Sequence, residues 1–367
     1  MIDFLIPKQK DIWLFGAWKG VQYADNSRAL FEYVCENKKS IRAIWLTSDD
    51  LVLKNIKNMG YEVYKFNSLD GIYYSIIAKV IIISVSYFDV SFWPYLFPWK
   101  LKIVQLWHGT PLKMIGENFI LKSQELFLCF FRIYLGRSFD LLITASEINF
   151  ALYSELFDID KQFIKVTGQP RNDNLFLNPL KKKHKVILYL PTWREYDPNF
   201  DLFFQFGFDV TVIDDFLERN NLYLFIKFHS LESSKGSNLV NIIAQSRRIK
   251  LANFKDVYFI LNNVDVLMTD YSSVYIDYLL LNRPIIFTPF DFDTYKEKRG
   301  FYYDYEKVTP GPKARSWDEV LECIDGVIKN DQFKERRTDI GRMFNSWNDK
   351  NNSSRVYSLV VNSVDNV

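Results

Sequence analysis

The sequence contains few of the residues that metal sites and disulfide frameworks need. Three cysteines and three histidines occur among its 367 residues. Cys35, Cys129 and Cys323 are widely spaced and odd in number, which favours reduced structural thiols over disulfides. Because no His/Cys/Asp cluster has metal spacing, we expect neither a metal nor a cofactor. Reduced thiols also favour a location in the cytosol.

The net charge is small, and the common glycine-rich phosphate-binding motifs are absent. The chain has no GxxxxGK[ST] segment and no GxGxxG segment that opens a helix, so a mononucleotide kinase and a dinucleotide oxidoreductase lose their main support. With 46 basic and 44 acidic residues the formal charge is +2, and no long basic stripe is present. We therefore expect no nucleic-acid partner, and an anionic ligand has to be bound locally by a few cations.

Apolar runs long enough to span a membrane are missing too. The two most apolar stretches, residues 79–100 and 119–136, are interrupted by prolines or charged residues, and the start of the chain lacks the features of a secretory signal. Aromatic side chains nevertheless concentrate at 92–99 and 119–135. They fit either a buried core, including a cover over an interdomain cleft, or a surface at lipid headgroups.

The sequence does contain a regular alternation of short apolar runs with helix-like segments, which is typical of parallel sheets covered by helices. We expect strands of a first sheet at residues 11–18, 41–47, 80–86, 102–107, 140–146 and 163–168. The pattern restarts with strands at 186–193, 222–229, 264–270 and 284–289. This predicts an α/β protein with an N-terminal domain at 1–168, a linker at 169–184, a C-terminal domain at 185–345 and a helical tail at 346–367. Ligands bind at the carboxyl ends of such strands, so we expect a cleft between two facing domains.

The segment DNSRALFEYVCENK, residues 25–38, has the periodicity of a helix. We expect Asp25, Asn26 or Ser27 to cap its first amides. Its apolar face comprises Leu30, Phe31 and Val34.

One histidine stands at the carboxyl end of an expected strand, in QLWHGTPLKMIG, residues 105–116. His108 is followed by Gly109, Thr110 and Pro111, which turn the chain and leave amides and a hydroxyl near the imidazole. An imidazole there can accept a proton near neutral pH, and Lys113 adds a positive charge nearby. The alternative is a histidine that only satisfies hydrogen bonds at the end of a strand.

A second histidine follows another expected strand, in FIKFH, residues 225–229. The alternation places Lys227 and His229 on one face, where two groups that can carry positive charge suit a phosphate. His229 would then face His108 across the cleft. An exposed lysine stem and an ordinary strand-end histidine are the alternative.

A polar cluster follows the strand expected at 264–270. Asp270, Ser272 and Ser273 precede a helix expected at 274–281, and its first amides form an anion site. Simple helix capping by the serines is the alternative.

Three arginines stand near strand ends or loops, where a guanidinium can bind a phosphate through two parallel hydrogen bonds. They are Arg171, Arg194 and Arg299. Taken singly, each also fits an exposed surface charge.

Eight segments, taken in order, resemble the CDP-glycerol glycerophosphotransferase family of teichoic acid and capsule synthesis, and most of all its single-unit priming members. They are DNSRALFEYV, QLWHGTPLKMIG, GQPRND, LPTWRE, FIKFH, DVLMTDYSSVYIDYLL, RPIIFTPFD and RGFYYDYE with PGP, within residues 11 to 312. One short motif would be weak support, whereas eight in the family's order are specific.

The resemblance implies a GT-B-like fold of two Rossmann-like domains, with an N-terminal domain that faces acceptor and membrane and a C-terminal domain that binds CDP-glycerol. The implied reaction transfers glycerol phosphate to a hydroxyl of an undecaprenyl-diphosphate-linked saccharide and releases CMP. It also implies peripheral binding to the cytoplasmic face of the bacterial membrane, through residues 92–99 and 119–135.

The resemblance also assigns roles to individual residues. His108 matches the family's base, and His229 matches its stabiliser of the donor phosphates. Ser230 stands where the family often has proline, which puts the geometry of that loop in question. The other expected ligands of the donor phosphates are Thr110, Lys113, Arg194, Lys227, Thr269, Asp270, Ser272, Ser273 and Arg299.

Several alternatives remain open at this point. CDP-ribitol could replace CDP-glycerol, because the sequence supplies no readable rule for alditol length. The length leaves little room beyond one catalytic unit, which fits a primer or a compact polymerase, and we expect a primer. A GT-B glycosyltransferase that uses a nucleotide sugar and a non-catalytic scaffold of cell-wall synthesis are two further classes.

Overall fold

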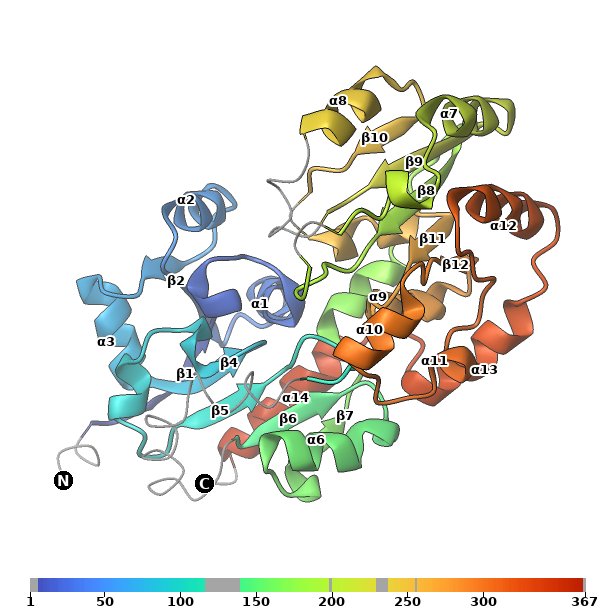
Figure 1. Ribbon diagram of the computed structural model, residues 1–367. Helices are drawn as coiled ribbons and strands as arrows, with labels where there is room; N and C mark the ends of the chain where they lie inside the picture. Colours follow the sequence, from blue (N-terminus) through green and yellow to red (C-terminus); the bar gives the residue numbers. More distant parts are fainter. Residues whose placement is uncertain (1–5, 116–138, 198–199, 229–236, 255, 366–367) are drawn as a thin grey trace. The chain divides into compact units, whose positions relative to one another are not determined.

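The computed structural model describes residues 6–115, 139–197, 200–228, 237–254 and 256–365 (Figure 1). These residues form two compact units. The first unit contains residues 6–110, 139–176 and 346–365, and the second contains 111–115 and the described part of 177–345. The short segment after His108 therefore belongs to the second unit, although most of its sequence neighbours belong to the first.

A parallel sheet forms the centre of the first unit, and its described part has seven strands in the order β3-β2-β1-β4-β5-β6-β7. The strands are β1 (Gln9–Phe15), β2 (Arg42–Thr47), β3 (Val63–Lys65), β4 (Ala78–Ile83), β5 (Lys102–Gln105), β6 (Leu141–Thr144) and β7 (Ile164–Val166). All residues of β4 are buried, as expected for a central strand that is covered on both faces.

Helices cover this first sheet. The longer ones are α1 (Asp25–Asn37), α2 (Asp50–Asn58), α3 (Leu69–Ile77), α6 (Phe150–Phe157) and α14 (Asn352–Asp365). Short 3-10 turns occupy the loops, among them η2 (Trp18–Gly20), η3 (Tyr87–Asp89), η4 (Trp93–Leu96), η5 (Glu147–Asn149), η6 (Lys161–Phe163) and η7 (Pro170–Phe176). Phe31 of α1 and Val360 of α14 pack in one core with Trp13, Phe15 and Trp45 of the sheet.

The start of α1 differs from the expected capped helix. Its N-cap residue is Ala24, whose methyl group cannot accept a hydrogen bond. Asp25, Asn26 and Ser27 are buried and bond to strand-end loops instead, because their side chains point into the unit. The capping prediction was therefore wrong for Asn26 and Ser27, whereas the Asp25 carboxylate does accept from the Asn26 amide of the first turn, at 2.8 Å. The predicted apolar face of Leu30, Phe31 and Val34 is confirmed by their complete burial.

The second unit is built on another parallel sheet, and its described part has five strands in the order β10-β9-β8-β11-β12. The strands are β8 (Lys185–Leu190), β9 (Leu222–Ile226), β10 (Ile249–Leu251), β11 (Val266–Thr269) and β12 (Ile285–Phe287). The helices are α7 (Val210–Arg219), α8 (Ser237–Gln245), α9 (Val274–Tyr278), α10 (Phe292–Lys298), α11 (Tyr305–Val308), α12 (Trp317–Lys329) and α13 (Lys334–Phe344), with 3-10 turns η8 (Phe204–Phe206), η10 (Val257–Phe259), η11 (Leu261–Asn263) and η12 (Leu279–Leu281).

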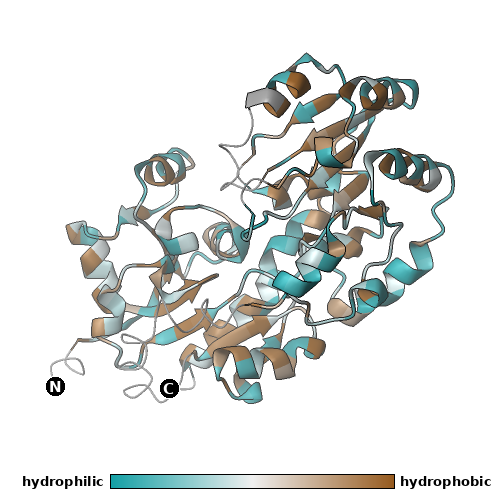
Figure 2. Cartoon of the chain, viewed as in Figure 1, coloured by the Kyte–Doolittle hydropathy of each residue, from teal (hydrophilic) through white to brown (hydrophobic). Residues whose placement is uncertain are grey.

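Aromatic packing fills the core of the second unit. The ring of Trp317, from α12, contacts Tyr189 of β8 and the loop residues Phe203 and Phe208. Figure 2 shows hydrophobic colour along the strands of both sheets, while many helices carry hydrophilic residues on part of their surface. This is the pattern of amphipathic helices that cover apolar sheets.

Every expected strand overlaps an observed strand, which confirms the predicted α/β class and the two Rossmann-like domains. The expectation missed β3 and β10, which have three residues each and lie at the edges of their sheets. Their length alone does not explain this, because the edge strands β7 and β12 also have three residues and were expected. Within the described residues, no helix combines the length and the apolarity needed to cross a membrane.

Candidate active site

His108 lies in a turn with unusual backbone geometry, directly after β5 ends at Gln105. Trp107 has φ 54° and Gly109 has φ 122°, so residues of the sparsely populated positive-φ region stand on both sides of His108. The Trp107 amide donates to the Gln105 side-chain oxygen at 2.9 Å. A non-glycine residue with positive φ persists only where its surroundings enforce it, and such residues cluster at functional sites.

Aromatic and polar side chains surround this turn. The half-buried His108 ring lies 4.0 Å from the Trp107 ring and 5.7 Å from the Trp18 ring, measured between centroids. Thr110 is buried, and its hydroxyl accepts a hydrogen bond from the Asn149 amide at 3.3 Å. The structure thus gives the Thr110 hydroxyl a partner within the first unit.

A buried carboxylate holds two neighbouring loops at the same edge of the sheet. Asp89 accepts hydrogen bonds from the amides of Lys19 at 3.0 Å, Ser84 at 2.9 Å and Val85 at 2.6 Å. Burial raises the pKa of Asp89 to about 6, although these bonds favour its ionised form. Trp18 and Lys19 both have positive φ, so this loop is a second constrained segment beside His108.

Arg171 is not an exposed cation. It is buried, and its Nη1 donates to the Asp25 carboxylate at 2.6 Å. Sequence reasoning placed Arg171 among possible phosphate ligands, but the structure uses its charge to neutralise a buried carboxylate at the start of α1.

Arg194 occupies a comparable position in the second unit. The guanidinium is 1% exposed and donates to Asp270 at 2.6 Å and to both oxygens of Asp291 at 2.9 and 2.6 Å. Although burial opposes ionisation, these bonds hold the pKa of Asp291 below its ordinary value. Asp291 was missed by sequence reasoning, because a lone Asp after a strand gives no signal of a buried partner.

Tyrosines complete this network. Tyr196 and Tyr271 donate their hydroxyls to Asp291 at 2.6 and 2.9 Å. The rings of Tyr271 and Tyr295 stack at 3.8 Å, and the Arg194 guanidinium carbon lies 4.9 and 5.3 Å from their centroids. The loops that follow β8, β11 and β12 are thereby tied together at the carboxyl ends of their strands.

The residues after β11 are largely engaged in the same framework. The buried Thr269 hydroxyl donates to the Leu190 carbonyl at 2.7 Å, and Asp270 also accepts from the Thr192 amide at 2.9 Å. The Ser272 hydroxyl accepts from the Val274 amide at a long 3.4 Å. Among the described residues, the Ser273 hydroxyl caps no amide of α9, so the alternative of simple helix capping does not account for both serines. Ser273 has helical backbone angles, whereas a capping residue typically has extended ones.

Two cations, Lys113 and Arg299, lie near one another in the second unit, and Lys113 also lies near Asp270. Residues 111–115 pair with the segment after α10, through bonds from the Met114 amide to the Gly300 carbonyl and from the Tyr302 amide to the Leu112 carbonyl. Burial, with the charge of Arg299 nearby, lowers the pKa of Lys113 to about 8.

Arg299 is only partly satisfied by protein groups. Its Nη1 lies 3.3 Å from the Glu195 carboxylate. Its Nε is buried and has no hydrogen-bond partner among the described residues. A guanidinium with an unused inward donor suits an anionic ligand.

Lys227 comes directly after β9. Its ammonium lies 5.5 Å from the centre of the Phe254 ring, and burial lowers its pKa. His229 and Ser230 lie outside the described residues, as does the segment 119–135. In the described part of the chain, no group of three or more His, Cys, Asp or Glu residues could hold a metal ion.

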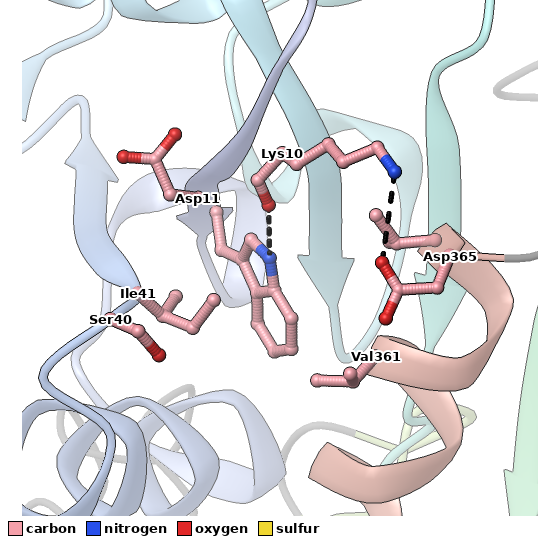
Figure 3. A pocket seen from close by; sticks show the side chains of 8 residues that line it. Lys10, Asp11, Ser40, Ile41, Val361 and Asp365 are labelled. Carbon is pink, nitrogen blue, oxygen red and sulfur yellow. Dashed lines mark hydrogen bonds and ion pairs between the residues drawn. The ribbon is translucent and has the colours of Figure 1, made fainter.

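A small pocket lies away from these strand ends, between the amino end of β1 and the carboxyl end of α14 (Figure 3). Lys10 and Asp365 form an ion pair of 3.7 Å across it. The lining residues are Lys10, Asp11, Trp13, Ser40, Ile41, Val361, Val364 and Asp365. None of them was a predicted site residue.

Comparison with known proteins identifies the family. The family model of CDP-Glycerol:Poly(glycerophosphate) glycerophosphotransferase matches residues 1–362. The chain is 29% identical to a teichoic acid poly(glycerol phosphate) polymerase of Bacillus spizizenii, over 87% of this chain and 84% of that protein. It is 28% identical to a teichoic acid glycerol-phosphate transferase of Staphylococcus aureus, over 96% and 93%.

The fold is similar to that of a solved teichoic acid polymerase. A structure of the wall teichoic acid polymerase TagF matches with a TM-score of 0.76 at 22% identity, over 98% of this chain and 90% of that one. The predicted GT-B-like fold is confirmed. The match of the family model to nearly every residue establishes that the chain is an enzyme of the CDP-glycerol:poly(glycerophosphate) glycerophosphotransferase family.

Proposed function

We propose that the protein transfers glycerol phosphate from CDP-glycerol to a hydroxyl of an undecaprenyl-diphosphate-linked saccharide, in the synthesis of wall teichoic acid or a related capsule polymer. The observation that carries this proposal is the family match over residues 1–362, which includes the constrained turn at His108. Both relatives are named for glycerol phosphate transfer or polymerisation. We propose a primer that adds one unit, and the alternatives are a polymerase and a CDP-ribitol-dependent enzyme.

In the proposed reaction, His108 takes the proton of the acceptor hydroxyl. The acceptor oxygen forms a bond to the phosphorus that carries glycerol, and the bond from that phosphorus to the bridging oxygen breaks. CMP leaves with the electron pair of that bond and develops negative charge on its phosphate. Phosphoryl transfer depends chiefly on positioning and on electrostatic stabilisation of this charge.

We propose that the cations of the second unit bind the donor phosphates. Lys113 supplies a partly desolvated ammonium, and Arg299 supplies a buried Nε that lacks a protein partner among the described residues. The further proposed ligands are Lys227, Ser272, Ser273 and His229. The family resemblance implied this role for His229, Ser272 and Ser273, and the strand alternation indicated it for Lys227.

Three other predicted ligands have a different proposed role. Arg194, Thr269 and Asp270 give their polar groups to protein partners, so we propose that they hold the phosphate-binding loops in place. Thr110 holds the His108 turn in the same way, through its bond with Asn149.

We also propose peripheral binding to the cytoplasmic face of the membrane. Phe92, Leu96 and Trp99 are 40%, 45% and 48% exposed, so apolar side chains gather on the surface at 92–99. Replacing all three with Ser should reduce sedimentation with anionic phospholipid vesicles severalfold. Unchanged sedimentation would show that these three residues do not contribute to membrane binding.

The proposed activity is tested by CMP release from the purified protein. CDP-glycerol, CDP-ribitol and UDP-glucose are supplied in parallel, with and without a short lipid-linked disaccharide acceptor. Acceptor-dependent CMP release from CDP-glycerol, with a product one glycerol phosphate longer, is the expected result. A ladder of longer products would favour the polymerase, and release of UDP from UDP-glucose would favour a glycosyltransferase. If no donor is consumed, the proposed function fails.

A further inference from the structure

We propose that Asn26 and Tyr153 are positioning residues for the transfer. Each donates a hydrogen bond to the backbone carbonyl of a residue next to His108, Asn26 to that of Trp107 and Tyr153 to that of Gly109. The inference rests on the proposed role of His108 as the base. The two residues come from α1 and α6, so two separate helices hold the turn from either end.

Asn26 holds the turn from its first end. Its side-chain nitrogen donates to the Trp107 carbonyl at 2.7 Å and also to the side-chain oxygen of Gln169. Its side-chain oxygen accepts from the Arg171 amide at 3.1 Å. The residue is completely buried, so each of its polar atoms is directed by a protein partner and not by water.

Asn26 is itself held in place. The Asp25 carboxylate accepts from the Asn26 amide at 2.8 Å and from Arg171 Nη1 at 2.6 Å. Asp25 has φ 68°, another positive value for a residue with a side chain. The helix thus begins with a first residue in a strained backbone conformation, and such residues cluster at functional sites.

Tyr153 holds the turn from its second end. Its hydroxyl donates to the Gly109 carbonyl at 3.1 Å, and its ring is fully buried. Gly109 has φ 122° and Trp107 has φ 54°, so the backbone on both sides of His108 is in conformations that external bonds must maintain. A displacement of about 1 Å in a reacting group can lower a rate by about a hundredfold.

The test compares Asn26→Ala and Tyr153→Phe with matched controls in the CMP release assay. Ser27→Ala is the control for Asn26, because Ser27 is equally buried but its hydroxyl bonds to the Ser84 hydroxyl and not to a backbone carbonyl of the turn. Tyr278→Phe is the control for Tyr153, because the buried Tyr278 donates in the same way to the Val264 carbonyl of the second unit. We expect kcat to fall about tenfold to a hundredfold in Asn26→Ala and less in Tyr153→Phe, with KM for CDP-glycerol within about twofold and both controls near wild type.

The decisive step repeats both substitutions in a His108→Ala background. If the two residues act through His108, their effects on the residual rate should vanish there. Equal losses in both backgrounds would show general structural damage and overturn the inference, as would wild-type kcat in both single variants. If Asn26→Ala does not fold, the milder Tyr153→Phe tests the inference alone, through its kcat in the wild-type and His108→Ala backgrounds. Wild-type activity in His108→Ala alone would instead overturn the proposed function.

Discussion

At the scale of single residues, Lys113 is a group whose charge can change within an ordinary assay range. Burial and the neighbouring Arg299 lower its pKa to about 8, so the ammonium is charged below that pH and loses its charge above it. If Lys113 binds a donor phosphate, affinity for CDP-glycerol depends on the protonated form and weakens as pH rises through about 8.

The expected outcome is a rise in KM for CDP-glycerol of about tenfold between pH 7 and pH 9. Lys113→Arg should flatten this rise, because a guanidinium stays protonated throughout. Lys298→Arg, on the exposed face of α10, should keep the wild-type profile. The measurement is the initial rate of CMP release at several donor concentrations and pH values. If KM rises equally in the Lys113→Arg variant, the titration of another group causes the pH dependence.

At the scale of elements, the loops after β8, β11 and β12 depend on one buried arginine. Arg194 pairs with carboxylates from the two other loops, Asp270 and Asp291. Removing one partner of a buried charge network leaves the other charges unpaired, which destabilises far more than the loss of an exposed pair.

We expect Arg194→Ala to lower the free energy of unfolding by about 3–5 kcal/mol in urea titrations. Arg247→Ala is the matched control, because Arg247 also pairs with carboxylates in the second unit but is 64% exposed. Its substitution should lower the free energy of unfolding by less than about 1 kcal/mol. If the Arg194→Ala protein has wild-type stability and a raised KM for the donor, Arg194 would be a ligand of the donor phosphates and not a structural residue.

The elements also indicate what sequence patterns can predict. The predicted strands lie in apolar runs of the sequence, which parallel strands form because they are buried on both faces. The start of α1 was misread, because Asp25, Asn26 and Ser27 have the composition of a cap but bond to distant loops. Contacts between residues far apart in sequence leave no periodic signal. For the same reason the motifs indicated a region for the candidate site, but not the pairing of Arg194 with Asp291.

At the scale of the whole molecule, the end of the chain completes the first unit. Asp173 accepts the amides of Asn352 and Ser353 at 2.9 Å each, which caps α14. Gly168, with φ 75°, lies against Asn352, and an added Cβ would stand 2.0 Å from the Asn352 side-chain oxygen. The helix is therefore packed against a backbone position where no side chain fits.

We expect Gly168→Ala to lower the free energy of unfolding more than Gly207→Ala. Both glycines have positive φ, so both substitutions introduce backbone strain of about 1 kcal/mol. An added Cβ at Gly207 meets nothing within 4 Å, whereas at Gly168 it collides with α14. Thermal unfolding of the two variants measures the difference. Equal losses would mean that α14 adjusts without penalty.

The central claim of this account is that His108 takes the proton of the acceptor in glycerol phosphate transfer. The most direct test is acceptor-dependent CMP release by His108→Ala beside His184→Ala, whose histidine follows the lysine run at 181–183. The account predicts a loss of about a hundredfold or more in His108→Ala, unchanged KM for CDP-glycerol, and wild-type activity in His184→Ala. Wild-type CMP release by folded His108→Ala protein would contradict the account.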